Sequence, residues 1–179
     1  MKPLDEFFLP DIASLDVRIG PLVFGKSESD YAHAALADLH RTLSMMTCHE
    51  NVPAHVRQNI DLAKNLLLYS IYVFDFTTAA VHYAQISLEA ALRRALGKGE
   101  ECRDNLDMML NEAVSRKLLD DSEHGPIAMR GFVSNARNGF AHGKEDREIY
   151  NHALAIPFVE AILSAINALF QDNALKDPR

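Results

Sequence analysis

The stretch from 54 to 96 contains neither glycine nor proline, so nothing in it would interrupt a helix. It predicts either one helix of about forty residues or two helices with a bend near 70–78. Residues 66–74 are apolar nearly all round, which predicts contact on more than one side, either inside the core or in a dimer. The second half has a helical stripe of apolar and small residues, namely Phe74, Thr77, Val81, Ala84, Leu88, Ala91, Leu92 and Ala95. Gly97-Lys98-Gly99 then predicts a C-cap.

Four further segments have the spacing of amphipathic helices, and they span 29–47, 100–119, 126–136 and 149–170. Asn51 and Pro53 predict a cap and a first turn for the long stretch. Arg116 and Lys117 are expected in the last turn of the second of these segments, where cations suit the helix dipole. Pro157 should kink the last helix or mark a restart, because it removes a backbone donor. Since no strand pattern alternates with these helices, we expect an all-α, up-and-down bundle of about five helices.

The first 27 residues follow a different pattern. They carry three prolines and an irregular apolar pattern, which predicts a mostly extended arm, with a short strand as one option for 15–19. The large apolar residues of the arm predict that it packs on the same chain or on a partner. The expected organisation is therefore an arm over 1–27, a helical bundle over 28–172 and a frayed tail over 173–179.

Composition narrows the class of protein. Apolar residues make up 48% and charged residues 24%, which is typical of a soluble globular chain. The net charge of −7 opposes a broad electrostatic grip on nucleic acid, so any contact with RNA must be local. Cys48 and Cys102 have no metal-ligand spacing and are expected to be reduced packing thiols. The N-terminus has acids where a signal peptide needs an apolar run, and we expect no window to approach the ~20 uncharged apolar residues of a membrane span. We therefore expect a cytoplasmic protein without a membrane segment.

Most familiar catalytic and cofactor motifs are missing. The sequence has no glycine-rich phosphate loop, no His-Glu-x-x-His, no paired cysteines and no Gly-x-Ser-x-Gly. His33 and His40 could share a helix face, but no carboxylate stands at a suitable spacing beside them. We therefore expect neither a cofactor nor a metal ion.

One polar junction interrupts the packing helices, and it runs from Phe132 to Gly143. On an uninterrupted helix the side chains of Arg137 and His142 would point about 140° apart. Gly139 and Gly143 allow the left-handed conformation that ends helices, so both side chains could point at the same space.

These side chains suit metal-free attack of an RNA 2′-hydroxyl on its own phosphodiester. His142 would act as general base or acid, a contribution of about 10²–10⁴-fold. Arg137 would stabilise charge on the phosphate, and Asn138 would orient either side chain. The structural alternative also stays open: Arg137 pairs with a carboxylate, Asn138 caps the helix and His142 bonds a loop carbonyl.

The sequence Arg-Asn-Gly-Phe-Ala-His-Gly, before a last amphipathic helix, resembles the Arg-Asn-x-x-x-His signature of the HEPN superfamily. Upstream, 83–96 resembles the long HEPN helix, in which an acid precedes a Leu-Arg pair. The resemblance covers roughly 69–170. It implies an α-helical domain that commonly dimerises. In active members Arg and His of both subunits meet in one cleft and cleave RNA without metal, often in toxin–antitoxin, phage-defence or CRISPR-linked systems.

Carried over to this chain, the resemblance nominates Arg137 and His142 as catalytic, with Asn138 supporting. Glu89 and Asp75 are candidates for the polar residue that the long helix contributes to the cleft. Asp75 also interrupts an apolar run, which predicts either a partner such as Arg137 or a place on the wet side of a bend. The implied partners are a second copy, RNA, and an antitoxin or defence protein.

The sequence also departs from the family pattern. Toxins of the nucleotidyltransferase-paired branch carry a Tyr two residues after the His, where this chain has Lys144, so the modification chemistry of that branch is not supported. The candidate RNA-binding cations are Arg130, Lys144 and Arg147, and acids at 145, 146 and 148 stand beside them. A non-catalytic HEPN-like dimer that binds RNA, a nucleotide or a protein is therefore the alternative function.

Overall fold

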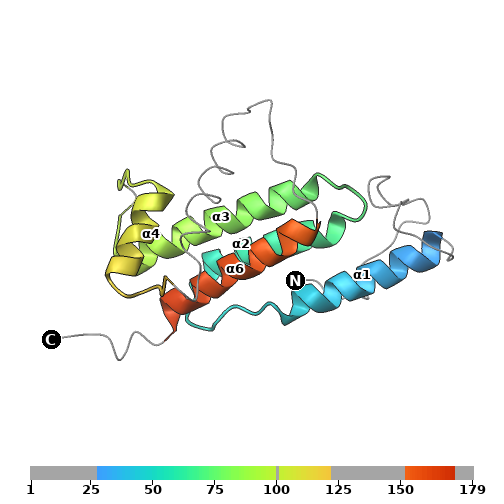
Figure 1. Cartoon of the computed structure of the whole chain (residues 1–179), viewed down its shortest axis with the longest axis horizontal. Helices are drawn as coiled ribbons and strands as arrows, with labels where there is room; N and C mark the ends of the chain where they lie inside the picture. The colour runs from blue at the N-terminus through green and yellow to red at the C-terminus, as the bar shows by residue number, and fades with distance from the viewer. Residues whose placement is uncertain (1–27, 100, 122–151, 172–179) are drawn as a thin grey trace.

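The computed structural model describes residues 28–99, 101–121 and 152–171 (Figure 1). Five helices lie in these ranges, and no strand occurs in them: α1 (Glu28–Met45), α2 (Ala54–Tyr69), α3 (Phe76–Ala95), α4 (Leu106–Ser115) and α6 (His152–Phe170). This confirms the all-α bundle expected from the sequence. The arm, the tail and the segment from 122 to 151 lie outside the described residues.

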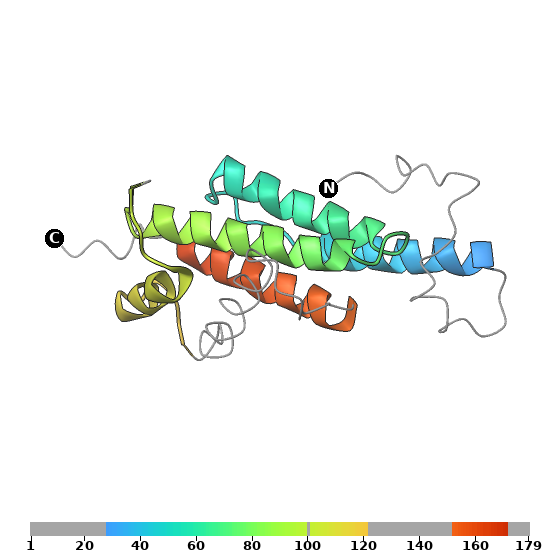
Figure 2. The same cartoon turned by 90° about the horizontal axis from the view of Figure 1, so that it is seen from above.

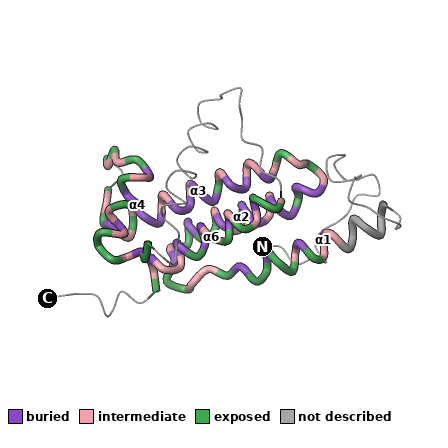
Figure 3. The backbone as a smooth tube through the Cα atoms, viewed as in Figure 1, coloured by how far each residue is buried: buried purple, intermediate pink, exposed green. Residues whose placement is uncertain are grey.

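Three helices form the centre of the bundle. Helix α3 packs on both α2 and α6, and α2 also contacts α6 (Figures 1 and 2). Helix α4 packs on α3 at one end, and α1 lies along α2, with its first part projecting beyond the bundle (Figure 2). Buried residues recur along α2, α3 and α6 (Figure 3), and these three helices contribute the larger part of the core. Its largest fully buried members include Ile60, Leu67, Leu88, Leu92, Ile162 and Ile166.

The long stretch without glycine or proline forms two helices, with a bend over 70–75 between α2 and α3. Ser70 ends α2, because its backbone N–H and its hydroxyl both donate to the Leu67 carbonyl, at 3.3 and 2.5 Å. Of the two arrangements that the sequence allowed, the bent one is the observed one.

Helix α3 ends as the glycine at 97 predicts. Gly97 has a φ of +69°. Its N–H donates to the Arg94 carbonyl at 3.2 Å, and the N–H of Lys98 donates to the Arg93 carbonyl at 2.9 Å. These two bonds are the Schellman pattern, which satisfies carbonyls at the end of a helix.

Two predicted boundaries were wrong. Helix α2 starts at Ala54 with Pro53 at the N-cap, so Asn51 does not cap it. Helix α4 spans only Leu106–Ser115, and not 100–119, because Asn105 caps it by accepting from the Met108 N–H at 2.8 Å. Lys117 closes it at the other end with a φ of 58°.

The ends of α4 also correct the expected place of two cations. The N–H groups of Lys117 and Leu118 donate to Val114 and Ala113, both at 2.9 Å, in a second Schellman pattern. Arg116 is the C-cap, and Lys117 follows it, so neither lies in the last turn of the helix. The predicted helix ran too far, to Leu119, because Leu119 is also buried although it lies after the turn that ends α4.

Helix α6 runs through Pro157 without being divided. It also corrects the expectation about membrane spans, since its 19 residues reach a mean hydropathy of 1.9, and by length and composition it could cross a membrane. Its exposed residues are mostly uncharged and include Leu154, and Glu160 is its one charged residue. The opposite face is buried, as in the core helix of a bundle.

Candidate functional site at the start of helix α6

The described structure holds two of the predicted site residues, Asp75 and Glu89. The predicted catalytic residues Arg137, Asn138 and His142 lie outside the described residues, as do the RNA-binding candidates Arg130, Lys144 and Arg147. The segment that carries them in sequence is followed by His152, the first residue of α6. The candidate site of the described structure therefore lies around His152 and the bend between α2 and α3.

His152 is joined to the end of α2. Its Nε2 lies 2.6 Å from the hydroxyl oxygen of Ser70, which is fully buried. The ring of Phe74 meets the imidazole edge to face, with centroids 6.1 Å apart and an interplanar angle of 76°. A serine in an otherwise apolar run thus receives its polar partner from α6.

The number of available protons determines which atom donates in the Ser70–His152 hydrogen bond. A hydroxyl has one proton, and that of Ser70 goes to the Leu67 carbonyl at 2.5 Å. Nε2 of His152 must then be the donor to Ser70, and this fixes the protonated nitrogen of the ring. Burial lowers the pKa of His152, so the imidazole is neutral at pH 7.

The Ser70–His152 pair does not have the arrangement of a nucleophile and its base. A base would have to accept the hydroxyl proton, whereas here the histidine donates and the proton goes to a carbonyl. Ser70 is also closed to solvent. We assign the pair a structural role, which is to fix where α6 starts.

The other end of α6 is held by Asn167. Its Nδ2 donates to the Thr47 carbonyl at 2.9 Å, and its Oδ1 accepts from the His49 N–H at 2.7 Å. Both partners belong to the connection between α1 and α2. Helix α6 is thus joined by side-chain hydrogen bonds at both ends, which fixes its position along the bundle.

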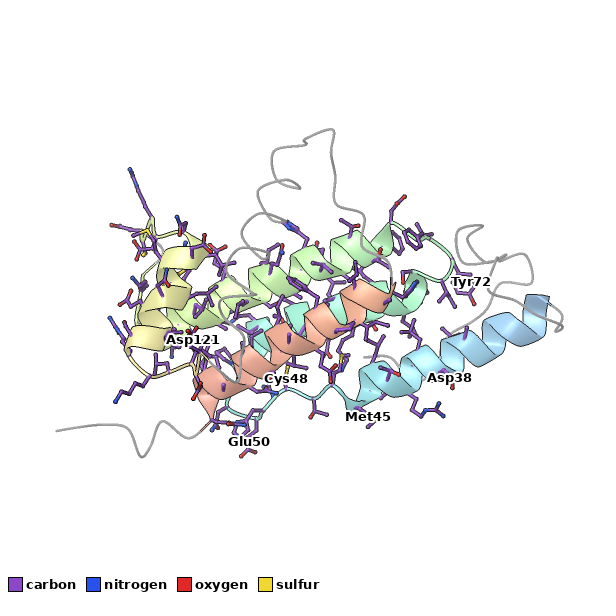
Figure 4. The ribbon with its side chains drawn as sticks, in the orientation of Figure 1. Asp38, Met45, Cys48, Glu50, Tyr72 and Asp121 are labelled. Atoms are coloured by element: carbon purple, nitrogen blue, oxygen red, sulfur yellow. The ribbon has the colours of Figure 1, made fainter. Side chains whose placement is uncertain are left out.

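The same connection is held by a buried lysine of α2. Lys64 donates from Nζ to the Met46 carbonyl at 2.7 Å, and burial lowers the pKa of its ammonium. Cys48 lies in this connection (Figure 4), where burial, and then the nearby Asp61 carboxylate, raise the pKa of its thiol. Cys48 and Cys102 are both free, and a raised pKa makes Cys48 a poor nucleophile.

Asp75 is exposed in the bend, directly before α3, and caps no backbone group of that helix with its side chain. Exposure favours the wet-side interpretation of this residue over a buried pair. Its predicted contact with Arg137 involves a residue outside the described part of the chain. Asp75 and Phe74 are adjacent in sequence, so the carboxylate stands at the end of the bundle where α6 begins.

Glu89 has a different environment. Its carboxylate accepts from Nη2 of Arg93 at 3.1 Å, with side chains 16% and 27% exposed, and Arg93 also donates to the Cys102 carbonyl at 2.9 Å. The pair therefore ties α3 to the loop before α4. Glu89 follows Asp75 by 14 residues, which is about 21 Å along a helix axis, so the two carboxylates cannot flank one small site.

An ion cluster continues this connection toward α4. Lys98 pairs with both Asp104 and Glu112, and Arg116 pairs with Glu112. The hydrogen bonds that Lys98 donates to these carboxylates raise the pKa of Lys98, and the same bonds lower the pKa of each carboxyl. In the ranges that the structure describes, no group of three or more His, Cys, Asp or Glu could hold a metal ion.

Sequence reasoning missed four residues that position these elements: Ser70, His152, Lys64 and Asn167. Ser70 had a signal, because it is a polar residue inside an apolar run and needs a partner when buried. The pairing of a buried residue of one helix with the first residue of another depends on packing, which periodicity alone does not specify.

Comparisons with protein-family models, with curated proteins and with solved structures found no match.

Proposed function

We propose that this chain is a metal-independent endoribonuclease of HEPN type that acts as a homodimer in stress response or phage defence. The observation that carries the proposal is the sequence Arg137-Asn138-x-x-x-His142, which precedes the last helix of an all-α bundle. The long helix that the resemblance requires corresponds to α3, and the last amphipathic helix corresponds to α6.

In the proposed reaction the RNA 2′-oxygen attacks the adjacent phosphorus while His142 takes the hydroxyl proton. The bond from phosphorus to the 5′-oxygen breaks, and the products are a 2′,3′-cyclic phosphate and a 5′-hydroxyl. His142 of the second copy would supply the proton to the leaving oxygen. Arg137 would stabilise the charge that grows on the phosphate, and Asn138 would orient either residue.

Of the two supporting acids, we assign only Asp75 to the proposed site. It is exposed at the end of the bundle where the segment containing the motif joins α6. Glu89 is left outside the cleavage machinery, because Arg93 occupies its carboxylate in a contact that links α3 to the loop before α4.

The charge of the protein supports a second proposal, a non-catalytic HEPN-like dimer that binds RNA, a nucleotide or a protein. A net charge of −7 gives little general attraction for RNA. The acids at 145, 146 and 148 also reduce the positive field that Arg130, Lys144 and Arg147 would create.

Cleavage of RNA in EDTA distinguishes the two proposals. The ribonuclease proposal expects the wild type to cleave, and His142→Ala and Arg137→Ala to lose about 10²-fold or more. His55→Ala and Arg57→Ala, which change exposed residues of α2, are the matched controls and should keep full activity. Absence of cleavage by the wild type would favour the binding protein.

A further inference from the structure

The apolar run at the end of α2 has an outward face as well as a buried one. Leu67 and Leu68 are fully buried, and Ile71 is 3% exposed. On the other side of the helix, Leu62 and Val73 are 40% and 42% exposed. The run is apolar all round because it serves the core on one side and a surface on the other.

The outward residues form a narrow stripe. Leu62, Leu66, Tyr69 and Val73 follow at spacings of four, three and four, so they share one side of the helix, and none of them is charged. The stripe is about 16 Å long, at 1.5 Å per residue. Three of its side chains are exposed, whereas an interface between separate proteins takes about 20–30 residues a side. A face of this size suits a short segment better than a second globular surface.

Helix α1 carries the N-terminal arm past the end of this stripe. Nζ of Lys64 donates to the Met46 carbonyl at 2.7 Å, which places the end of α1 beside the middle of α2. From there α1 runs back past the bend between α2 and α3 (Figures 1 and 2). Its 18 residues span about 27 Å, whereas Lys64 and Val73 are about 14 Å apart along a helix axis. The arm over 1–27 therefore joins α1 roughly 13 Å beyond Val73.

One segment of the arm has a pattern that matches the stripe. Leu15, Val17 and Ile19 alternate with Asp16 and Arg18, so an extended backbone puts three apolar side chains on one face and two charges on the other. Residues on the same face of an extended segment are about 6.7 Å apart, so the three side chains cover about 13 Å. That is most of the length of the stripe, and the two charges would stay in water.

We infer that residues 15–19 dock in extended form along the outward stripe of α2 in the same chain. The segment runs parallel to α2, because the arm returns from beyond the bend. In this register Leu15 lies beside Leu62, and Ile19 lies beside Val73. The docked arm would hold the projecting first part of α1 against the bundle.

The connection between this segment and α1 is long enough for the return. The nine steps from Ile19 to Glu28 reach at most about 30 Å, which exceeds the roughly 13 Å between Val73 and the start of α1. Gly20-Pro21 and Gly25 lie in this connection, and both residue types favour the turns that reverse a chain.

The covalent link favours this occupant over a separate molecule. A segment tied to α1 by a short linker is present near the stripe at an effective concentration of about millimolar. A few apolar contacts then suffice, whereas a free partner also loses its translational and rotational freedom on binding. The inference uses neither Arg137 nor His142, so it stands apart from the proposed ribonuclease.

Disulfide trapping in the full-length chain tests the register. Leu15→Cys with Leu62→Cys, and Ile19→Cys with Val73→Cys, should each form a bond within one chain on mild oxidation. The crossed pairs, Leu15→Cys with Val73→Cys and Ile19→Cys with Leu62→Cys, use the same four positions and should react at least about tenfold more slowly, because a disulfide needs Cα atoms within about 7 Å. Equal rates in matched and crossed pairs would overturn the inference.

A mixing experiment tests whether the stripe is covered by its own chain. Chains that carry only Leu15→Cys, oxidised together with chains that carry only Leu62→Cys, should give no covalent dimer joined at these positions. Peptide mapping separates such a product from bonds that involve the native Cys48 and Cys102. A dimer joined through positions 15 and 62 as the main product would show that another chain covers the stripe, and would overturn the inference.

Thiol labelling tests the docking without a cross-link. In a chain with Val73→Cys, adding Val17→Asp should raise the rate of maleimide labelling at position 73 about tenfold, because a charge replaces the central apolar contact. Adding Asp16→Ser, on the opposite face of the segment, is the matched control and should leave the rate unchanged. An unchanged rate with Val17→Asp would overturn the inference. Loss of RNA cleavage alone would count only against the ribonuclease.

Discussion

Nε2 of His152 lies 2.6 Å from the hydroxyl of Ser70, and this contact joins the first residue of α6 to the end of α2. Together with Asn167 at the other end, it fixes α6 along the bundle. The position of α6 in turn sets where the segment with the proposed cleavage motif joins the helices. Four predictions test these positioning contacts.

Ser70→Ala should lower the free energy of unfolding by about 1–3 kcal/mol, because it leaves the half-buried Nε2–H of His152 without its acceptor. Ser44→Ala is the matched control. Ser44 also donates to a carbonyl, that of His40 at 2.7 Å, and lies near a histidine nitrogen, but it is exposed. Urea unfolding should show an effect of the control below about 0.5 kcal/mol. Equal losses in both variants would contradict the assigned role of Ser70.

The stability of the wild type should fall as the pH decreases below about 6.5, the pKa of an unperturbed histidine. Burial lowers the pKa of His152 in the folded protein, so as the pH falls the unfolded chain is protonated before the folded one. This protonation stabilises the unfolded state and lowers the free energy of unfolding. The slope cannot exceed about 1.4 kcal/mol per pH unit, which is the limit for the binding of one proton. His152→Gln keeps an N–H donor but does not titrate, so urea midpoints of the two proteins should converge between pH 7.5 and 5.5. A constant difference would refute the prediction.

Asn167→Ala should destabilise the fold by about 1–2 kcal/mol, since it removes the hydrogen bonds to Thr47 and His49. The amide of His49 should then exchange hydrogen faster. Gln171→Ala, at an exposed position just past α6, should leave that exchange rate unchanged. Slow exchange in both variants would mean that other contacts hold the connection between α1 and α2.

Glu89→Gln should lower stability by about 1 kcal/mol, because it weakens the half-buried pair with Arg93. RNA cleavage per folded molecule should stay at the wild-type rate, since we place Glu89 outside the cleavage site. If the cleavage rate falls tenfold or more while stability is unchanged, Glu89 belongs to the cleavage site and this assignment is wrong.

The sequence predicted the helices whose apolar spacing is regular and whose ends carry strong signals. Gly97 is the clearest case, because only a residue that tolerates positive φ closes α3 in the observed way. The start of α4 was placed too early because the Asn105 cap was not recognised, although the apolar spacing begins only at Leu106. The hydropathy of α6 was underestimated because its exposed residues, Leu154 among them, are almost all uncharged.

The candidate site was predictable only in part. Asp75 and Glu89 both looked like acids of one long helix, and only their surroundings separate them, since Arg93 of the same helix engages Glu89 and also binds the loop before α4. Ser70 and His152 are 82 residues apart, and no local pattern links them. Such pairings depend on which helices pack together.

The end groups of the RNA products test the central claim most directly. We expect the wild type in EDTA to cleave an RNA oligonucleotide to 2′,3′-cyclic phosphate and 5′-hydroxyl ends, and to leave a 2′-O-methyl version of it intact. His142→Ala should lose the activity, and His55→Ala should retain it. Cleavage of the methylated RNA, equal cleavage by His142→Ala, or an inactive dimeric wild type would contradict the account.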